Sequence, residues 1–273
     1  MTLPAVRNAA VRLRFLGTGT SFGVPQIGCA CAVCHSTDPR DKRTRCGAVI
    51  ETDGTRLLID TPPELRLQIV AAGITDIDAV LFTHEHADHI HGIDDLRAFT
   101  MRRKEPLMLY GEAPTLELLR QRFPYIVDDR LRPLPGTTKP EGRLVTVQGG
   151  VPFEVQGVQV LPISIPHGRT PVLGFRVGDI AYITDAKSLP ASARDALVGV
   201  RVLVINALLR AQHPTHLSVS EAVRVAQEIG AERTFLTHLT HENFHADLAA
   251  ELPAGISPAY DGLVVTLDPD PTP

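Results

Sequence analysis

Short apolar runs with the length of β-strands recur along the whole chain. Most contain four to eight residues and are rich in Val, Ile and Leu, which is typical of strands that are buried on at least one face. They lie at residues 11–16, 48–51, 56–60, 79–83, 107–110, 144–147, 158–165, 173–177, 180–184, 202–205, 234–237 and 263–267. The pattern therefore predicts more strands than helices.

Helical periodicity is confined to fewer segments, at residues 62–72, 114–122, 190–198 and 218–229. In the last of these, Ser218 or Ser220 is the expected N-cap, Glu221 lies in the first turn and Gly230 ends the helix. Hairpin-like strand clusters come first and strand–helix units follow. This order predicts an α/β (α+β) protein in which helices cover two mixed sheets.

The chain is long enough, with 273 residues of which 44% are hydrophobic, to bury a large core. Composition does not change across the proline-rich residues 133–140, so we predict a loop there within one domain of residues 1–273. The formal net charge of −4 provides no general attraction for nucleic acid or anionic lipid. Residues 1–16 show neither a leader nor a membrane anchor, and we expect a cytoplasmic protein.

The densest chemical feature is a run of histidines that directly follows an apolar run. Four of the eleven histidines fall within residues 84–91, which read HEHADHIH. Imidazoles and carboxylates at the end of a strand can converge on one point, and they are ligands for zinc, manganese and iron. The segment therefore predicts a metal site rather than a polar surface loop.

The candidate ligands in this segment are too many and too close in sequence to bind a single ion. Alternation separates them into two pairs, His84 with His86 and Asp88 with His89, which predicts two ions. Further ligands are expected at other strand ends, because a sheet brings such side chains to a common edge. The candidates that follow apolar runs are His167, Asp185 and His238.

Three of the four cysteines are also gathered within six residues. Cys29, Cys31 and Cys34 form this cluster, and Cys46 lies apart. Cysteines two or three residues apart rarely form well-shaped disulfides with one another, and a chain of this size does not depend on such cross-links. The cluster therefore indicates thiolates bound to a metal ion.

The histidine and aspartate pattern of this chain resembles the metal-binding pattern of the metallo-β-lactamase superfamily. The pattern is His-x-His-x-Asp-His at residues 84–89, followed by single residues at three predicted strand ends. The resemblance extends over nearly the whole chain, from the glycine-containing loop at 15–21 to residues 261–262. It implies a four-layer αββα sandwich. The Asp-His form of the motif is similar to the phosphodiesterase and nuclease members rather than to the lactamases proper.

The resemblance also implies how two divalent metal ions share the ligands. His84, His86 and His167 would bind one ion, and Asp88, His89 and His238 would bind the other. Asp185 would bridge the two ions. Manganese and zinc both suit these ligands.

The cysteine cluster is similar to one branch of the superfamily, the PhnP-type phosphoribosyl 1,2-cyclic phosphate phosphodiesterases. In that branch a similar cluster and a distant histidine bind a structural zinc ion, which implies a zinc loop at residues 28–35. His241 matches the distant histidine. Cys46 and His35 are the alternative fourth ligands, although His35 would strain the loop because it adjoins the last cysteine of the cluster.

This branch implies hydrolysis of a cyclic phosphate ester, either phosphoribosyl 1,2-cyclic phosphate or a related cyclic nucleotide. The departing oxygen needs a proton, and His216 matches the histidine that faces the leaving group in these enzymes. A well-placed general acid contributes about 10²–10⁴ in rate. Asp88 and His216 are therefore the predicted catalytic residues, and His216 would also contact the substrate.

Two features of the sequence concern the walls and contacts of the substrate pocket. Residues 206–210, which read NALLR, replace an acidic segment of the branch, so we expect the pocket wall to differ there. The basic runs at 40–45 and 102–104 are candidates for phosphate contacts, although charge runs are more often solvated.

One competing motif is disfavoured, and two other functions remain as alternatives. Residues 241–245, HENFH, match the HExxH motif of zinc proteases, but no separate third ligand is evident. A tRNA 3′-processing-type endonuclease would share the paired-metal ligands and should carry a protruding basic arm. A non-catalytic protein similar to pyrroloquinoline-quinone biosynthesis protein B would keep the cysteine loop. We expect a small phosphodiester substrate, no nucleic-acid or membrane partner, and a homodimer as the common default.

Overall fold

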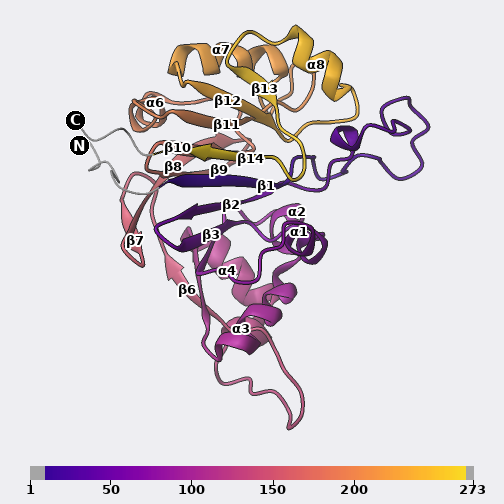
Figure 1. The fold of residues 1–273 in the computed structure, drawn as a ribbon. Helices are drawn as coiled ribbons and strands as arrows, with labels where there is room; N and C mark the ends of the chain where they lie inside the picture. The colour runs from indigo at the N-terminus through magenta and orange to yellow at the C-terminus, as the bar shows by residue number, and fades with distance from the viewer. Residues whose placement is uncertain (1–9, 269–273) are drawn as a thin grey trace.

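The computed structural model describes residues 10–268, in which two mixed β-sheets pack face to face between helices (Figure 1). The predicted domain also includes residues 1–9 and 269–273, which lie outside the described residues. Within residues 10–268, each sheet has seven strands, in the orders β14-β1-β2-β3-β4-β5-β6 and β13-β12-β11-β10-β9-β8-β7.

The strands are β1 Val11–Gly17, β2 Gly47–Thr52, β3 Thr55–Ile59, β4 Ala79–Leu81, β5 Leu107–Gly111, β6 Gly142–Thr146, β7 Phe153–Val155, β8 Val158–His167, β9 Thr170–Val177, β10 Ile180–Ile183, β11 Val202–Asn206, β12 Arg233–Thr237, β13 Ile256–Pro258 and β14 Val264–Leu267. The helices are α1 Leu65–Ala71, α2 Ala87–Ile90, α3 Arg97–Arg103, α4 Ala113–Arg122, α5 Pro124–Val127, α6 Ala191–Ala196, α7 Val219–Ile229 and α8 His245–Glu251, with 3₁₀ turns η1 Pro39–Asp41 and η2 Ile93–Leu96.

The apolar side chains form three layers of core. The inner faces of the two sheets bury one cluster between them, including Leu13, Ile50, Phe175 and Tyr182. The outer face of the first sheet packs against α1, α3 and α4, and the outer face of the second packs against α6, α7 and α8 (Figure 1). The predicted four-layer αββα architecture is therefore confirmed.

Strand direction brings several strand ends to one edge. β3 and β4 run parallel in the first sheet, and β10, β11 and β12 run parallel in the second. β8 runs in the same direction as β10, because both pair antiparallel with β9. The residues that follow these strands therefore gather where the two sheets meet.

Every apolar run identified in the sequence overlaps a strand of the structure, and the four helical segments correspond to α1, α4, α6 and α7. The sequence pattern missed β7 and β13, which have three residues each, and the helices α2, α3, α5 and α8. β7, β13, α2 and α5 have only three or four residues each, too few to show a period of their own. The predicted loop at 133–140 lies in the irregular segment between α5 and β6, which extends from the lower end of the molecule (Figure 1).

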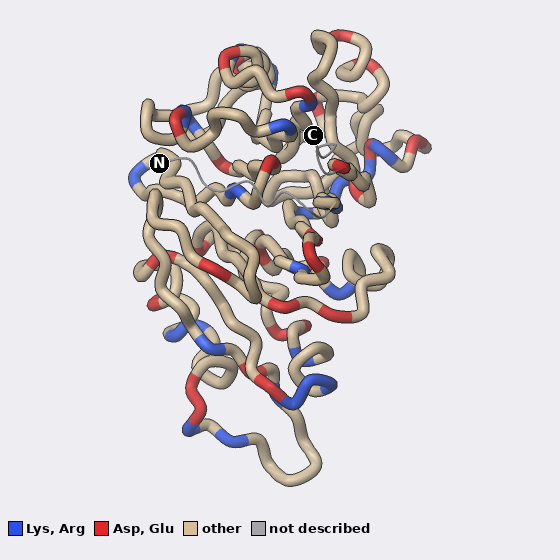
Figure 2. Tube along the Cα trace, turned by 60° about the vertical axis from the view of Figure 1, so that its left-hand side comes forward, with Lys and Arg blue, Asp and Glu red and all other residues tan. Residues whose placement is uncertain are grey.

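The surface shows no single charged character. Lys, Arg, Asp and Glu are interspersed along the described trace (Figure 2). None of the helices within residues 10–268 has the length and apolar character needed to cross a bilayer.

The N-terminus of α7 has both hydrogen bonds of a capping box. Ser218 Oγ accepts a hydrogen bond from Glu221 N at 3.3 Å, and Ser218 N donates to Glu221 Oε2 at 2.8 Å. Gly230 ends the helix in the left-handed conformation, with φ 70°. Of the two predicted caps, the structure selects Ser218.

Replacing Ser218 by alanine should lower the free energy of unfolding by about 1 kcal/mol, because Glu221 N loses the Ser218 Oγ atom that accepts its hydrogen bond. Denaturant unfolding measures this loss. Ser192→Ala, an exposed change on α6, serves as the control and should stay within about 0.5 kcal/mol of the unmodified protein. Equal stabilities of the two variants would contradict the capping role.

Candidate metal centre

The histidine-rich segment leaves the end of β4 in an extended conformation and then turns into α2. His84 and His86 lie on the extended part, and Asp88 and His89 lie on α2. His84 and His89 are buried, while His86 is exposed. The segment therefore presents side chains from the protein interior out to the surface.

The three separate candidate ligands lie at strand ends of the second sheet. His167 is the last residue of β8, Asp185 lies just beyond β10, and His238 directly follows β12. Asp185 and His238 have left-handed backbone conformations, with φ 57° and 58°. Such backbone strain costs on the order of 1–3 kcal/mol at a residue other than glycine and is concentrated at functional sites.

The structure brings the seven predicted ligands into two adjacent groups. The possible ligand atoms of one group lie within 4.8 Å of one another, as do those of the other. The first group is His84, His86, His167 and Asp185, and the second is Asp88, His89 and His238.

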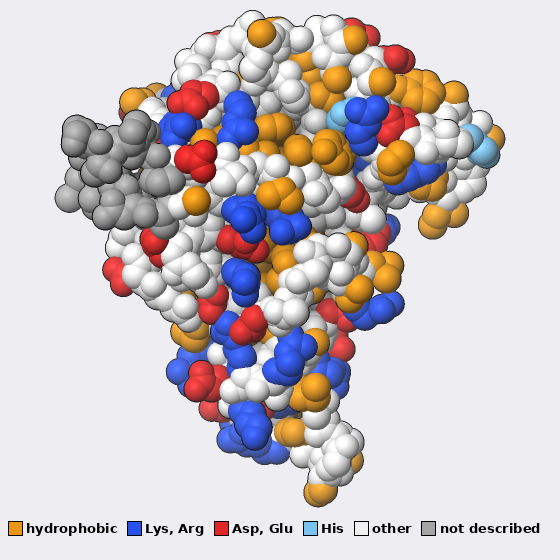
Figure 3. All heavy atoms as spheres, in the orientation of Figure 1, with side chains coloured by type: hydrophobic (Ala, Val, Ile, Leu, Met, Phe, Trp, Pro, Cys, Tyr) orange, Lys and Arg blue, Asp and Glu red, His pale blue; other side chains and the backbone are white. Residues whose placement is uncertain are grey.

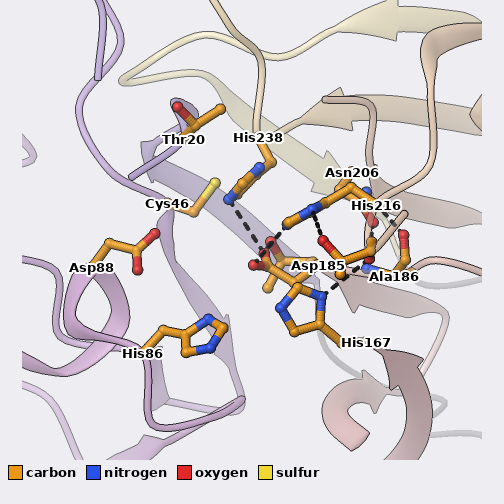
Figure 4. A network of polar contacts seen from close by, with 12 residues as sticks. Thr20, Cys46, His86, Asp88, His167, Asp185, Ala186, Asn206, His216 and His238 are labelled. Atoms are coloured by element: carbon orange, nitrogen blue, oxygen red, sulfur yellow. Dashed lines mark hydrogen bonds and ion pairs between the residues drawn. The ribbon is translucent and has the colours of Figure 1, made fainter. Parts of the chain in front are cut away.

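Asp185 lies between the two groups. Its Oδ2 atom is 3.7 Å from Nε2 of His84 and 3.7 Å from Nε2 of His89, and its Oδ1 atom is 3.4 Å from Nε2 of His238. Two ligands about 2.1 Å from one tetrahedral ion lie about 3.4 Å apart. One carboxylate is therefore placed to serve both groups (Figure 4).

Buried nitrogen atoms without partners support this interpretation. Among the described residues, Nε2 of His89 and both ring nitrogens of His238 have no hydrogen-bond partner. Buried polar atoms are nearly always partnered, so such orphans need an explanation. A divalent cation would use these lone pairs, and the donor set fits one.

Burial lowers the pKa of three of the candidate histidine ligands. Burial lowers the pKa of His84 well below its ordinary value, lowers the pKa of His167, and lowers the pKa of His238 to about 4. Their rings are therefore neutral near pH 7. A neutral imidazole is the form that binds a metal ion.

His89 differs because it faces carboxylates on several sides. Burial opposes its protonation, but the negative charges of Asp60 and Asp185 outweigh burial and raise the pKa of His89 to about 10. Asp60 accepts a hydrogen bond from His89 Nδ1 at 2.7 Å. That bond leaves Nε2 of His89 directed toward the metal-binding residues, where a cation would take the place of the proton.

Asp60 is the main site residue that the sequence analysis missed. It directly follows β3 and has a left-handed backbone conformation with φ 61°, like Asp185 and His238. Its carboxylate also accepts hydrogen bonds from Thr83 N and Thr83 Oγ1, both at 2.8 Å. The available signal was an aspartate at the end of an apolar run, but its role depends on a contact with a segment 29 residues away.

Hydrogen bonds orient two further rings. The Thr83 hydroxyl donates to Asp60, so its oxygen accepts from Nδ1 of His84 at 2.9 Å. His167 Nδ1 donates to the carbonyl oxygen of Thr215 at 3.1 Å. In both histidines the proton lies on Nδ1, which leaves the Nε2 lone pair for a metal ion.

The predicted general acid lies against the shared carboxylate. Nε2 of His216 is 3.2 Å from Oδ2 of Asp185, and the His216 ring stacks on His238 with a centroid distance of 5.0 Å. Figure 4 shows His167, His216 and His238 converging on Asp185, with His86 and Asp88 on the opposite side.

The cysteine cluster forms a second group of possible ligands. Nδ1 of His241 lies 3.3 Å from Sγ of Cys29, 3.6 Å from Sγ of Cys31 and 3.5 Å from Sγ of Cys34. In a tetrahedral zinc site with ordinary bond lengths, nitrogen and sulfur ligands lie about 3.6 Å apart. The residues therefore fit a zinc ion with one imidazole and three thiolates.

The alternative fourth ligands lie elsewhere. Cys46 is buried, and its thiol contacts Gly19 O at 3.2 Å, while Nδ1 of His35 lies at the carbonyl oxygen of Cys31. Hydrogen bonds from the backbone, first that of Cys34, lower the pKa of Cys31 to about 6, which favours its thiolate form.

Comparison with known families agrees with this geometry. Residues 55–239 match the β-lactamase superfamily domain. The chain belongs to the metallo-β-lactamase superfamily. The match includes the histidine-rich segment and the strand-end candidates His167, Asp185 and His238.

Several superfamily proteins are similar over most of this chain. The crystal structure of a new diphosphatase from the PhnP family is 37% identical with a TM-score of 0.87, covering 94% of this chain and 98% of the other. A ribonuclease Z from a Mycobacterium species is 28% identical, covering 73% of this chain and 79% of that protein. A coenzyme PQQ synthesis protein B from Methylorubrum populi is 30% identical, covering 70% and 71%.

One relative carries a name of a different kind. An octanoyltransferase from Porphyromonas gingivalis is 43% identical over 264 residues, which are 94% of this chain and 52% of that protein. This chain therefore spans about half the length of that curated relative.

Asn206, which departs from the pattern of the branch, contacts the backbone next to Asp185. Asn206 is buried, its Oδ1 atom accepts from Ala186 N at 2.7 Å, and its Nδ2 atom donates to Ala186 O at 3.1 Å. These bonds fix the backbone next to Asp185 (Figure 4). Asn206 thus fixes the backbone beside the Asp185 carboxylate, and the altered pocket wall expected at residues 206–210 stays a prediction.

The HExxH interpretation is wrong. α8 begins at His245, so His241 precedes the helix and the two histidines do not share a helical face. His241 instead faces the cysteine cluster, and His245 packs against Tyr260.

Arginines of both basic runs form ion pairs with carboxylates of the same chain. Arg103 forms ion pairs of 2.7 Å with both Asp76 and Asp78, and Arg45 pairs with Glu64. These contacts favour structural roles over phosphate binding.

The Asp60→Asn variant should bind divalent metal about 10- to 100-fold more weakly, because His89 loses the carboxylate that orients it and raises its basicity. Competition with a chromophoric chelator measures the affinity. Asp76→Asn removes a surface ion pair with Arg103 and should leave the affinity unchanged. Equal affinities for the two variants would contradict the role of Asp60.

Proposed function

We propose that this chain is a metal-dependent phosphodiesterase that uses two divalent metal ions, manganese or zinc, to hydrolyse a cyclic phosphate ester. The observation that carries the proposal is the position of Asp185, whose carboxylate lies within 3.7 Å of imidazole nitrogens from both ligand groups. Paired cations suit displacement at phosphorus, because they neutralise phosphoryl oxygens and activate a water molecule.

Each candidate residue of this chain would have a distinct role. His84, His86 and His167 would hold one cation, Asp88, His89 and His238 the other, and Asp185 both. His216 would donate a proton from Nε2 to the oxygen that leaves phosphorus. Its contact with Asp185 supports this role, since it holds the ring beside the ligand groups.

The proposed substrate is phosphoribosyl 1,2-cyclic phosphate or a related cyclic nucleotide. Similarity to the PhnP-family structure supports a small phosphorylated substrate. That protein is called a diphosphatase, which favours a second candidate, hydrolysis of a phosphoric anhydride. Both reactions place a phosphoryl group between two cations, and they differ in the leaving group.

Other activities have weaker support. A tRNA-processing enzyme should present a basic arm, but in the protruding segment between α5 and β6 Arg130 pairs with Asp128 at 2.7 Å, and Leu131 and Leu134 are exposed. Lys and Arg gather on the lower part of one face, with Asp and Glu among them (Figure 3). A non-catalytic role would not require the orphaned nitrogens of His89 and His238 to face one carboxylate.

Removal of metal should abolish hydrolysis of a 2′,3′-cyclic nucleotide, and added manganese or zinc should restore it. Steady-state assays on chelator-treated protein, with metal content by mass spectrometry, test the proposal. A nucleoside diphosphate sugar is the matched anhydride substrate. Unchanged turnover in metal-free protein would contradict metal dependence, and a preference of more than about 10-fold in kcat/KM for the anhydride, a difference above about 1.4 kcal/mol, would favour the second candidate.

We propose a structural zinc ion at the cysteine cluster and His241. The Cys31→Ser variant should lose one zinc per chain and unfold at lower temperature, because the loop at 28–35 is no longer attached to the segment after β12. Cys46→Ser changes a buried thiol outside the cluster and should keep its zinc content. Retention of all zinc by Cys31→Ser would contradict the assignment.

A further inference from the structure

A chain of polar side chains extends outward from His216. Its Nδ1 atom lies 2.9 Å from Thr215 Oγ1, and that hydroxyl lies 3.2 Å from Nδ1 of His213. The two histidine Nδ1 atoms are 3.3 Å apart. His213 is thus the outer end of a chain whose inner end is the contact between His216 and Asp185.

The backbone gives this chain a direction. Thr215 N donates to Nδ1 of His213 at 3.3 Å, so this nitrogen carries a lone pair. The Thr215 hydroxyl can share this lone pair with Thr215 N, donating to His213 while its own oxygen accepts from Nδ1 of His216. The proton of a neutral His216 therefore lies on Nδ1.

The surroundings keep His213 in the accepting form. Partial burial, followed by the nearby His216 and Lys187, lowers the pKa of His213 below its ordinary value. Lys187 is itself held by Glu221, at 3.1 Å. A neutral His213 retains the lone pair that the chain requires.

We propose that His213 is a positioning residue that acts through Thr215 to hold the Nδ1–H group of His216, so that the Nε2–H group of the protonated ring is directed at the leaving group. This inference rests on the proposed function, in which His216 protonates the departing oxygen. As the phosphorus–oxygen bond breaks, the Nε2 proton passes to the oxygen. The imidazole left behind is neutral with its proton on Nδ1, which is the form that Thr215 and His213 accept from.

The kinetic test compares two leaving groups. With a 2′,3′-cyclic nucleotide, whose leaving group is a sugar hydroxyl, His213→Ala should lower kcat/KM by about 10- to 100-fold, part of the about 10²–10⁴ that a general acid supplies. With a p-nitrophenyl phosphodiester, whose leaving group departs without a proton, the loss should stay below about 2-fold. A merely structural role would lower both rates equally.

Matched variants separate the contact from the fold. His213→Asn can place an amide oxygen near the former Nδ1 position and should recover most of the activity, whereas Thr215→Val should resemble His213→Ala. Gln212→Ala, an exposed change in the same loop, should behave as the unmodified protein. Equal losses on both substrates, or no loss on the cyclic nucleotide, would overturn the inference.

A measurement without substrate distinguishes failure of this inference from failure of the proposed function. Nitrogen-15 spectra of the zinc-loaded protein should show His216 protonated on Nδ1, and a mixture of forms in His213→Ala. If the unmodified protein hydrolyses neither substrate, the proposed function fails, and these spectra still decide the contact. Identical His216 spectra in the two proteins would overturn it.

Discussion

The site depends on one buried carboxylate at the edge where the two sheets meet. Burial alone would make the negative charge of Asp185 costly, by several kcal/mol in an apolar environment. The neighbouring imidazoles of His238 and His89, together with the contact from Nε2 of His216, overcome burial and hold the pKa of Asp185 well below its ordinary value. The left-handed backbone at Asp185 is stabilised because the Asn206 side chain hydrogen-bonds to both N and O of Ala186, the next residue. The fold therefore creates a fixed negative charge for cations to occupy.

The two proposed metal sites share one segment of chain. His238 belongs to the second ligand group and His241 faces the cysteine cluster three residues later. Between them, Leu239 N donates to Thr18 O at 2.9 Å, which attaches this segment to the loop after β1. A zinc ion at the cysteine cluster would thus restrain the backbone that carries His238. This arrangement explains why a loop of small and polar residues can adopt a defined position.

Sequence reasoning reached the ligands because they are local features. An apolar run predicts a strand, and the polar residue after it lies at the edge of a sheet, as His167, Asp185 and His238 do. The supporting residues could not be predicted in this way. Asp60, Thr83 and Asn206 act through contacts between segments that become neighbours only when both sheets have formed. Their residue types are common at strand ends and in turns, so no local pattern distinguishes them.

The histidines of the site are distinguished by what lies behind them. In His84 and His167 the Nδ1 proton is donated to a hydroxyl or carbonyl oxygen, which leaves an Nε2 lone pair for a cation. His216 has the same kind of bond through Thr215, but its hydroxyl partner leads outward to another imidazole rather than to a carboxylate or carbonyl. In the proposed reaction, the imidazole of His213 can adjust its hydrogen bonds as His216 gives up and regains a proton, whereas a metal ligand needs a partner that does not change. The proposed metal ligands and the proposed proton donor therefore differ in the second contact of each ring, and not in residue type.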